Sequence, residues 1–221
     1  GAAVGSVKSL QARRFRGTYA DLMASPMFGP AARFFLEELY SDTDYTDRDQ
    51  QFGRIAGTLQ TIFPQPVVNT AVALAVLHAQ TEELDQDMGR AWLAHEEADA
   101  ANDAARYTAA WRTVGQRHAR QQQLQRVLAM GTDLARLTRT PGLRMMLRMM
   151  RGPANAAGMG ALQKFLEAGF DTFGQLARQR GGVEQFLATI EQRERALMDL
   201  LFDADPVTCG TQLNHTLGQA R

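Results

Sequence analysis

Apolar residues recur every three or four positions along nearly the whole chain, and no segment alternates apolar and polar residues as a strand does. This pattern predicts an all-α protein in which about eight helices form one globular bundle without a sheet. The segment 67–77 is apolar on every side, as expected of a central helix surrounded by its neighbours. We therefore expect one helical domain over residues 1–206, followed by a polar, frayed tail over residues 207–221.

Proline, glycine and capping residues divide this pattern into the expected helices. The predicted helical segments are 7–24, 31–40, 46–63, 66–97, 103–137, 141–151, 161–180 and 183–202. Within 103–137, the apolar stripe moves to the opposite face near residues 115–123, which predicts a kink or a helix that touches two different layers. The glycine-rich run 152–160 is expected to be a loop.

Charge is unevenly distributed along the chain, although its 24 basic and 24 acidic residues give no net charge. Residues 82–103 contain eight acidic residues and one basic residue, and residues 106–151 contain ten arginines and one acidic residue. This separation predicts either ion pairing of the two segments, within one chain or between two, or an arginine-lined surface for an acidic partner. The arginines are spread around the long helix rather than gathered on one face, so nucleic-acid binding is not expected.

Composition narrows the class of protein and its location. With 45% hydrophobic and 22% charged residues, the chain has the composition of a folded globular protein. No apolar run reaches the ~20 residues that a membrane-spanning helix needs. The first residues lack the apolar core of a signal peptide, and the single cysteine, Cys209, excludes an internal disulfide. We therefore expect a cytoplasmic protein without a membrane span.

Sequence patterns of the common enzyme classes are missing. The chain has no Gly-x-Ser-x-Gly motif, and its glycines at 152, 158 and 160 do not match a phosphate-binding loop. Acidic pairs such as Glu82 and Glu83 are adjacent, so their side chains point about 100° apart on a helix and cannot act together on one substrate. No catalytic residue is predicted.

The candidate interaction surface combines aromatic, methionine and arginine side chains. Arg144, Arg148 and Arg151 recur at i, i+4 and i+7 and form a cationic stripe. Phe34 lies off the main apolar stripe of its helix, which favours either cover by a second helix or a self-complementary patch in a homodimer. The predicted contact residues are Phe34, Tyr40, Arg144, Met146, Arg148 and Arg151.

These features favour a non-enzymatic interaction or regulatory protein that acts through self-association, as a homo-oligomer, or through a protein partner. Such a protein needs no cofactor. A solvated basic face and a contact with a membrane surface are the other interpretations of the arginine stripe, and both stay open.

The histidines offer an alternative function. His78, Glu82 and Asp85 are spaced at i, i+4 and i+7 on one helix face, a geometry that can hold a divalent metal. His118 is expected on the aromatic face of Trp111, where an imidazole can ligate haem. The alternative is therefore a small-molecule or haem-binding helical protein with His78, Glu82 or His118 as ligand. A hydrogen-bonded or exposed side chain is the simpler interpretation of each histidine.

Five blocks of sequence resemble an uncharacterised family of bacterial helical proteins. The blocks are TYADL at 18–22, AARFFLEELY at 31–40, DRD at 47–49, LQKFLEAGF at 162–170 and FLATIEQRE at 186–194. The first three resemble the opening of that family and the last two its end. The resemblance implies a helical, cytoplasmic protein without an assigned activity, and it transfers no site residues.

Overall fold

The computed structural model describes residues 1–41, 61, 63–95 and 102–220 of the 221-residue chain. These residues form eleven α-helices and contain no strand, so the fold is all-α, as the periodicity predicts. The helices are α1 (Ala2–Thr18), α2 (Ala20–Ala24), α3 (Gly29–Leu39), α5 (Gln65–Ala94), α6 (Asp103–Val114), α7 (Arg117–Leu137), α8 (Leu143–Met149), α9 (Arg151–Ala156), α10 (Gly160–Ala177), α11 (Gly182–Asp203) and α12 (Pro206–Gly218). The predicted helix 46–63 lies almost wholly outside the described residues.

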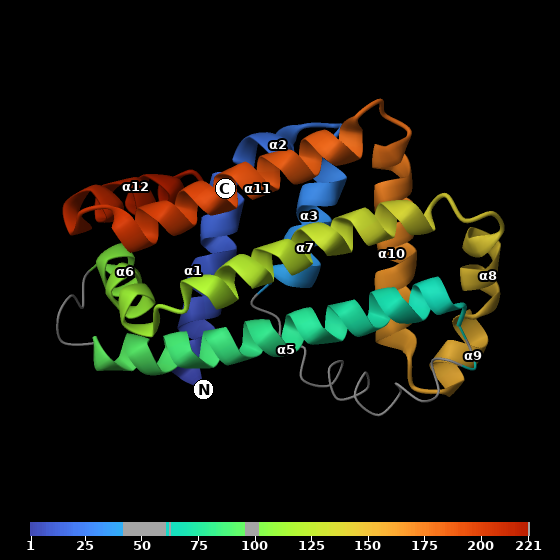
Figure 1. Ribbon diagram of the computed structural model, residues 1–221, viewed down its shortest axis with the longest axis horizontal. Coiled ribbons are helices and arrows are strands. Elements are labelled where there is room, and N and C mark those ends of the chain that lie inside the picture. The colour runs from blue at the N-terminus through green and yellow to red at the C-terminus, as the bar shows by residue number, and fades with distance from the viewer. Residues whose placement is uncertain (42–60, 62, 96–101, 221) are drawn as a thin grey trace.

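The helices form two crossing layers (Figure 1). Helices α5, α7 and α11 run side by side in one layer, and α7 contacts both of its neighbours. Behind them, α1, α3 and α10 cross this layer, with α1 packed on α5 and α10 packed on α7. Helices α6 and α12 lie at one end of the bundle, and α8 and α9 lie at the other. Within the described ranges, none of the helices has the length and apolar character that crossing a membrane requires.

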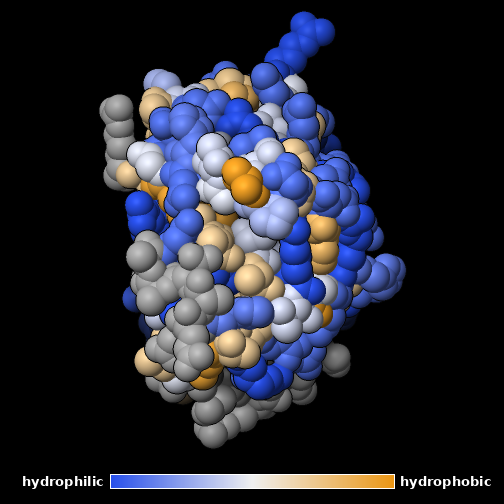
Figure 2. All heavy atoms as spheres, turned by 90° about the vertical axis from the view of Figure 1, so that its left-hand side faces the viewer, coloured by the Kyte–Doolittle hydropathy of each residue, from blue (hydrophilic) through white to orange (hydrophobic). Residues whose placement is uncertain are grey.

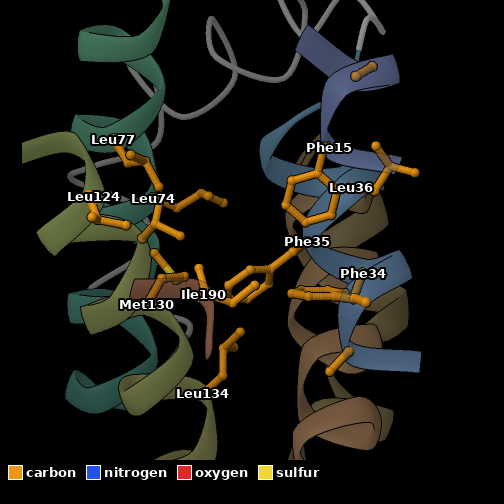
Figure 3. Packing of buried hydrophobic residues seen from close by; sticks show 14 of the residues in the cluster. Phe15, Phe34, Phe35, Leu36, Leu74, Leu77, Leu124, Met130, Leu134 and Ile190 are labelled. Carbon is orange, nitrogen blue, oxygen red and sulfur yellow. The ribbon is translucent and has the colours of Figure 1, made fainter. Parts of the chain in front are cut away.

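Aromatic residues fill the space between the two layers (Figure 3). Phe35 of α3 is fully buried and points toward Met130 of α7 and Ile190 of α11. Its ring centre lies 5.9 Å from that of Phe173 and 5.1 Å from that of Phe186. One cluster of buried apolar residues continues from α1 to α12, so the helices share a single core.

Phe34 also belongs to this core, which agrees with the interpretation that a second helix covers it and contradicts the alternative of a surface patch. Its side chain is 5% exposed, and its ring centre lies 5.4 Å from that of Phe165 and 6.1 Å from that of Phe173. Both partners belong to α10, so a second helix covers Phe34. Because α3 packs against α10 as well as against the rest of the core, the adjacent positions 34 and 35 are both buried.

The position of α5 differs from the prediction of a central helix. Val67, Leu74 and Leu77 are buried, but Val72 and Val76 are 47% and 43% exposed. Helix α5 is an outer member of its layer, and α7 holds the middle position. An apolar run on all sides of this helix therefore does not indicate burial on all sides.

Two helix boundaries also differ from prediction. Gly115 and Gln116, with φ angles of 63° and 56°, divide the segment 103–137 into α6 and α7. The shift of the apolar stripe coincides with this break, so the stripe belongs to two helices rather than to one kinked helix. The run 152–160, expected as a loop, contains most of α9 and the first residue of α10.

The segment predicted as a frayed tail instead forms α12. The side chain of Asp205 caps this helix by accepting a hydrogen bond from the Thr208 N–H at 2.9 Å. Cys209, Leu213 and Leu217 recur at i, i+4 and i+8 and are buried, and α12 packs on α1 and α6. Three apolar residues at helical spacing are enough to dock a segment whose other positions are mostly polar.

The oppositely charged segments lie side by side, because α6 and α7 both pack on α5. Among the described residues, however, no ion pair joins the acidic segment 82–103 to the basic segment 106–151. Arg106 instead donates to the backbone carbonyl of Trp92, and other arginines pair with acids of α10 and α11. In these residues, the charge separation along the sequence is not matched by direct pairing of the two segments.

A glycine at the crossing of α1 and α12 provides a test of the docked position of α12. A Cβ atom at Gly17 would lie 1.8 Å from the backbone oxygen of Thr216, whereas one at Gly5 would meet no atom within 4 Å. We predict that Gly17→Ala lowers the free energy of unfolding by about 1–3 kcal/mol, because the two helices have to separate. The control Gly5→Ala should raise it by up to about 1 kcal/mol through helix propensity. Urea denaturation measures the free energy of unfolding of both variants. Equal effects of the two substitutions would contradict the docked position of α12.

Candidate functional site

A polar cavity of about 110 Å³, called the central cavity below, lies where α1, α5, α6, α7 and α11 meet the C-terminal end of α3. The charged residues of its wall are the basic Lys8, Arg14 and Arg120 and the acidic Glu38, Glu82, Asp85 and Glu194. Charge inside an apolar core is costly unless it is compensated, and convergent polar groups in a cavity are typical of functional sites. We therefore treat this cavity as the candidate functional site.

Helix geometry directs these charges inward, because they occupy positions in apolar stripes. Arg14 lies four residues after the buried Leu10, and Glu194 lies midway between the buried Ile190 and Met198. Arg14, Arg120 and Glu194 are not among the predicted site residues. The available signal was a charged residue at a position where the stripe calls for an apolar one.

Arg14 and Glu194 form a buried, bidentate ion pair. Nη1 of Arg14 lies 2.8 Å from Oε2 of Glu194, and Nη2 lies 3.0 Å from Oε1. Burial by itself lowers the pKa of Arg14, but the charge of Glu194 and the nearby tyrosines outweigh burial, so the pKa is raised. The guanidinium therefore stays cationic. The pair links α1 to α11, near the two ends of the chain.

Tyr40 lies beside this ion pair. Its ring stacks on Phe15 at a centroid distance of 4.5 Å, and Cζ of Arg14 lies 5.7 Å from its ring centre. Burial, followed by the negative charge of Glu194, raises the pKa of Tyr40, so its hydroxyl stays protonated. Predicted as part of an interaction surface, Tyr40 is instead half-buried in the cavity wall.

Arg120 lies over the ring of Trp111, with Cζ 3.4 Å from the ring centre. Arg120 is 4% exposed, and its Nε donates to the carbonyl of Gly115 at 3.2 Å. Within the described part of the chain, Nη2 of Arg120 and Nε1 of Trp111 are buried without a hydrogen-bond partner. Both atoms are donors and belong to residues that line the cavity, so two buried N–H groups beside it lack an acceptor.

The turn between α6 and α7 positions these two side chains. Gly115 adopts φ 63° and ψ −116°, and the non-glycine Gln116 adopts φ 56° and ψ 42°. The N–H of Gly115 donates to the carbonyl of Trp111 at 2.8 Å, while its own carbonyl accepts from Arg120. Unfavourable backbone conformations persist where the surrounding structure fixes them, and they cluster at functional sites.

Asp85 of α5 is buried in the same wall. Burial raises the pKa of its carboxyl to about 6, while nearby Lys8 and Arg120 act in the opposite direction. Lys8 pairs with Glu82 at 2.7 Å, and among the described residues Asp85 forms no ion pair but hydrogen-bonds the side chain of Gln11. Asp85 is thus a buried acid that changes its protonation just below neutral pH.

The predicted ligand residues His78 and Glu82 line the cavity together with Asp85, as their spacing on one helix face predicts. Nε2 of His78 lies 3.3 Å from the backbone oxygen of Glu38. The described residues nevertheless contain no group of three or more His, Cys, Asp or Glu side chains that could hold a metal ion. The shared face therefore contributes to a polar wall, not to a metal centre of described residues.

His118 is exposed on α7 and lies 3.2 Å from Nε2 of Gln122. The break at Gly115 redirects α7 relative to α6, so Arg120 rather than His118 lies against Trp111. The expected position of His118 on the aromatic face is wrong, because that expectation assumed a continuous helix.

Two of the three arginines in the predicted cationic stripe form ion pairs within the chain. Arg144 contacts Glu167 at 3.1 Å and Asp171 at 2.7 Å, and Arg151 contacts Glu167 at 2.7 Å. These contacts fasten α8 and α9 to α10, while Arg148 is exposed. Little of the stripe is therefore available to an acidic partner.

The end of the molecule formed by α6 and α12 is mainly hydrophilic. Figure 2 shows this end, where hydrophobic residues outside the grey atoms form separate spots among polar ones. Single apolar residues are ordinary on protein surfaces. Outside the grey atoms, the view shows no continuous hydrophobic patch at this end.

The chain belongs to the protein family described as "Domain of unknown function (DUF8198)", whose family model matches residues 1–208. The match confirms the resemblance to an uncharacterised helical family. Comparison with curated proteins and with solved structures found no match. The geometry of the cavity therefore carries the functional argument.

Asp85 should make stability depend on pH. In the unfolded chain its carboxyl loses the proton near the ordinary pKa of 3.8, whereas in the folded chain it keeps the proton up to about 6. Stability therefore falls as pH rises between these values, and the full penalty is present above the folded-state pKa. We predict that Asp85→Asn is more stable than the wild type by about 2–3 kcal/mol at pH 8, and that the difference vanishes near pH 4.

Chemical denaturation across this pH range measures the effect. Asp199→Asn, at an exposed position of α11, is the matched control. A stability difference between wild type and Asp85→Asn that stays constant with pH would show that Asp85 is not a buried acid with a raised pKa.

Proposed function

We propose that the chain binds a small polar molecule in the central cavity and that Arg120 and Trp111 hold an acceptor group of this ligand. The observation that carries the proposal is the pair of buried N–H groups without a partner, Nη2 of Arg120 and Nε1 of Trp111. An unsatisfied buried donor costs free energy, and a ligand oxygen removes that cost. A cytoplasmic location, expected from the composition, is part of this proposal.

The size of the cavity limits the ligand. An apolar cavity of about 150 Å³ accommodates benzene, so about 110 Å³ suits a molecule of roughly five non-hydrogen atoms. A porphyrin is far larger, and this volume favours a small ligand over haem. A carboxylate or a phosphate has the required size and acceptor atoms.

The environment strengthens such an interaction. Arg120 is held by stacking on Trp111 and by its bond to Gly115, so its remaining donors are oriented before the ligand arrives. Charge-assisted hydrogen bonds are stronger in a buried site than in water. Binding should therefore depend strongly on the guanidinium of Arg120.

Fluorescence offers a direct test, because the chain has only two tryptophans. In a Trp92→Phe background, Trp111 is the sole reporter, and titration with acetate or phosphate should change its emission. We predict that Arg120→Met weakens binding of the better probe by about tenfold or more, the effect of losing a charge-assisted hydrogen bond. Arg136→Met, on an exposed side chain of the same helix, is the control. Equal binding by Arg120→Met, or no response to any small molecule that carries a carboxylate or phosphate group, would sink the proposal.

Self-association through α8 is a second candidate function. Met145 and Met149 are 69% and 72% exposed, Met146 is also exposed, and Arg148 is next to them. Exposed methionines adapt to varied partner surfaces and are enriched at interfaces. Of the predicted interaction residues, Met146 and Arg148 belong to this proposed surface.

Size-exclusion chromatography with light scattering tests the second candidate. We predict a homodimer that Met149→Glu weakens by about tenfold or more, because a carboxylate would be buried in the interface. Val207→Glu, at a 78% exposed position of α12, should leave the dimer intact. A monomeric wild type would refute self-association and leave the cavity proposal untouched.

A further inference from the structure

We infer that the ligand of the central cavity is a small zwitterion, with a carboxylate against Arg120 and Trp111 and an ammonium group against Asp85. The smallest α-amino acids are ligands of this chemical type. This inference rests on the proposed function, because it specifies the ligand class of the same site.

The charge pairing within the cavity carries the inference. Lys8 pairs with Glu82 at 2.7 Å, and Arg14 pairs with Glu194 at 2.8 Å. Arg120 and Asp85 appear in no ion pair among the described residues. The wall therefore keeps one buried cation and one buried acid that are not bonded to each other, and a zwitterion complements both.

A simple anion or a simple cation satisfies only one of these groups. An anion at Arg120 would add negative charge to a wall that already contains Asp85 and Glu82. A cation at Asp85 would leave Nη2 of Arg120 and Nε1 of Trp111 without an acceptor. A molecule with both charges supplies the two oxygens and the N–H donors at once.

The surroundings of Asp85 are consistent with an ammonium partner. The groups that face it are Lys8 and Gln11 from α1, Glu82 from its own helix, Tyr107 from α6 and Arg120 from α7. Lys8 is bonded to Glu82, and Gln11 donates to the hydroxyl of Tyr107 at 3.3 Å and also hydrogen-bonds the carboxyl of Asp85, so the only direct partner of Asp85 among these groups is an uncharged amide. A bound ammonium would offset the burial that raises the pKa of Asp85, so ligand binding and deprotonation of Asp85 should be coupled.

Isothermal titration calorimetry of the full chain with glycine, acetate and methylammonium tests the inference. At pH 8 we expect glycine to bind at least about tenfold more tightly than either single-charge probe, because it satisfies both groups. At pH 5, Asp85 is mostly protonated, and the preference of glycine over acetate should shrink. Asp85→Asn should abolish the preference for glycine over acetate at pH 8, while acetate still binds. The control Asp199→Asn should change neither the preference nor the binding of acetate.

The outcomes separate the two proposals. If acetate binds as tightly as glycine to the wild type at pH 8, the zwitterion inference is overturned and the proposed function stands. If glycine, acetate and methylammonium all fail to bind the wild type and phosphate also fails, both are overturned. This comparison uses the unmodified protein, so it holds even if a variant does not fold.

Discussion

The buried ion pair between Arg14 and Glu194 is the constraint on which the central cavity depends. It joins α1 to α11, and Tyr40 packs against it at the cavity wall. Removing one partner of a buried pair generally costs about 3–5 kcal/mol, whereas an apolar pair of similar volume is often no less stable. Stability alone therefore does not explain these charges. The proposed ligand site gives a reason for them, because the ion pair forms part of the cavity wall without filling the space.

Packed helices hold Arg120, Trp111 and Asp85 at the cavity wall. Arg120 and Trp111 come from two helices joined by the turn at Gly115, whose backbone bonds to both residues. Asp85 comes from α5, which packs on α1, α6 and α7. In the proposed function, side chains that are already held in place lose little conformational freedom when a ligand binds, which favours affinity and selectivity. The fold thus brings the N–H donors of Arg120 and Trp111 and the carboxyl of Asp85 from three helices to one small cavity.

Much of the fold follows from the sequence, because helical periodicity reports burial along each helix. The period predicts the all-α class, and the break near residue 115 is visible as a shift of the stripe. Periodicity does not identify which neighbour covers a face, so it leaves both cover and a surface patch open for Phe34, and it wrongly predicts a central position for α5. The docking of α12 depends on three apolar positions in a polar segment, too weak a pattern to separate from a frayed tail.

The site was less predictable than the fold. His78 and Glu82 share a face by helical spacing, which sequence alone reveals, but their partners Arg14, Arg120 and Glu194 are distant in the chain. A crystal structure of the protein grown with glycine is the sharpest test of the proposed site. We expect one small molecule whose carboxylate oxygens lie about 3 Å from Nη2 of Arg120 and Nε1 of Trp111. A structure in which Arg120 pairs directly with Asp85 and closes the cavity would contradict it.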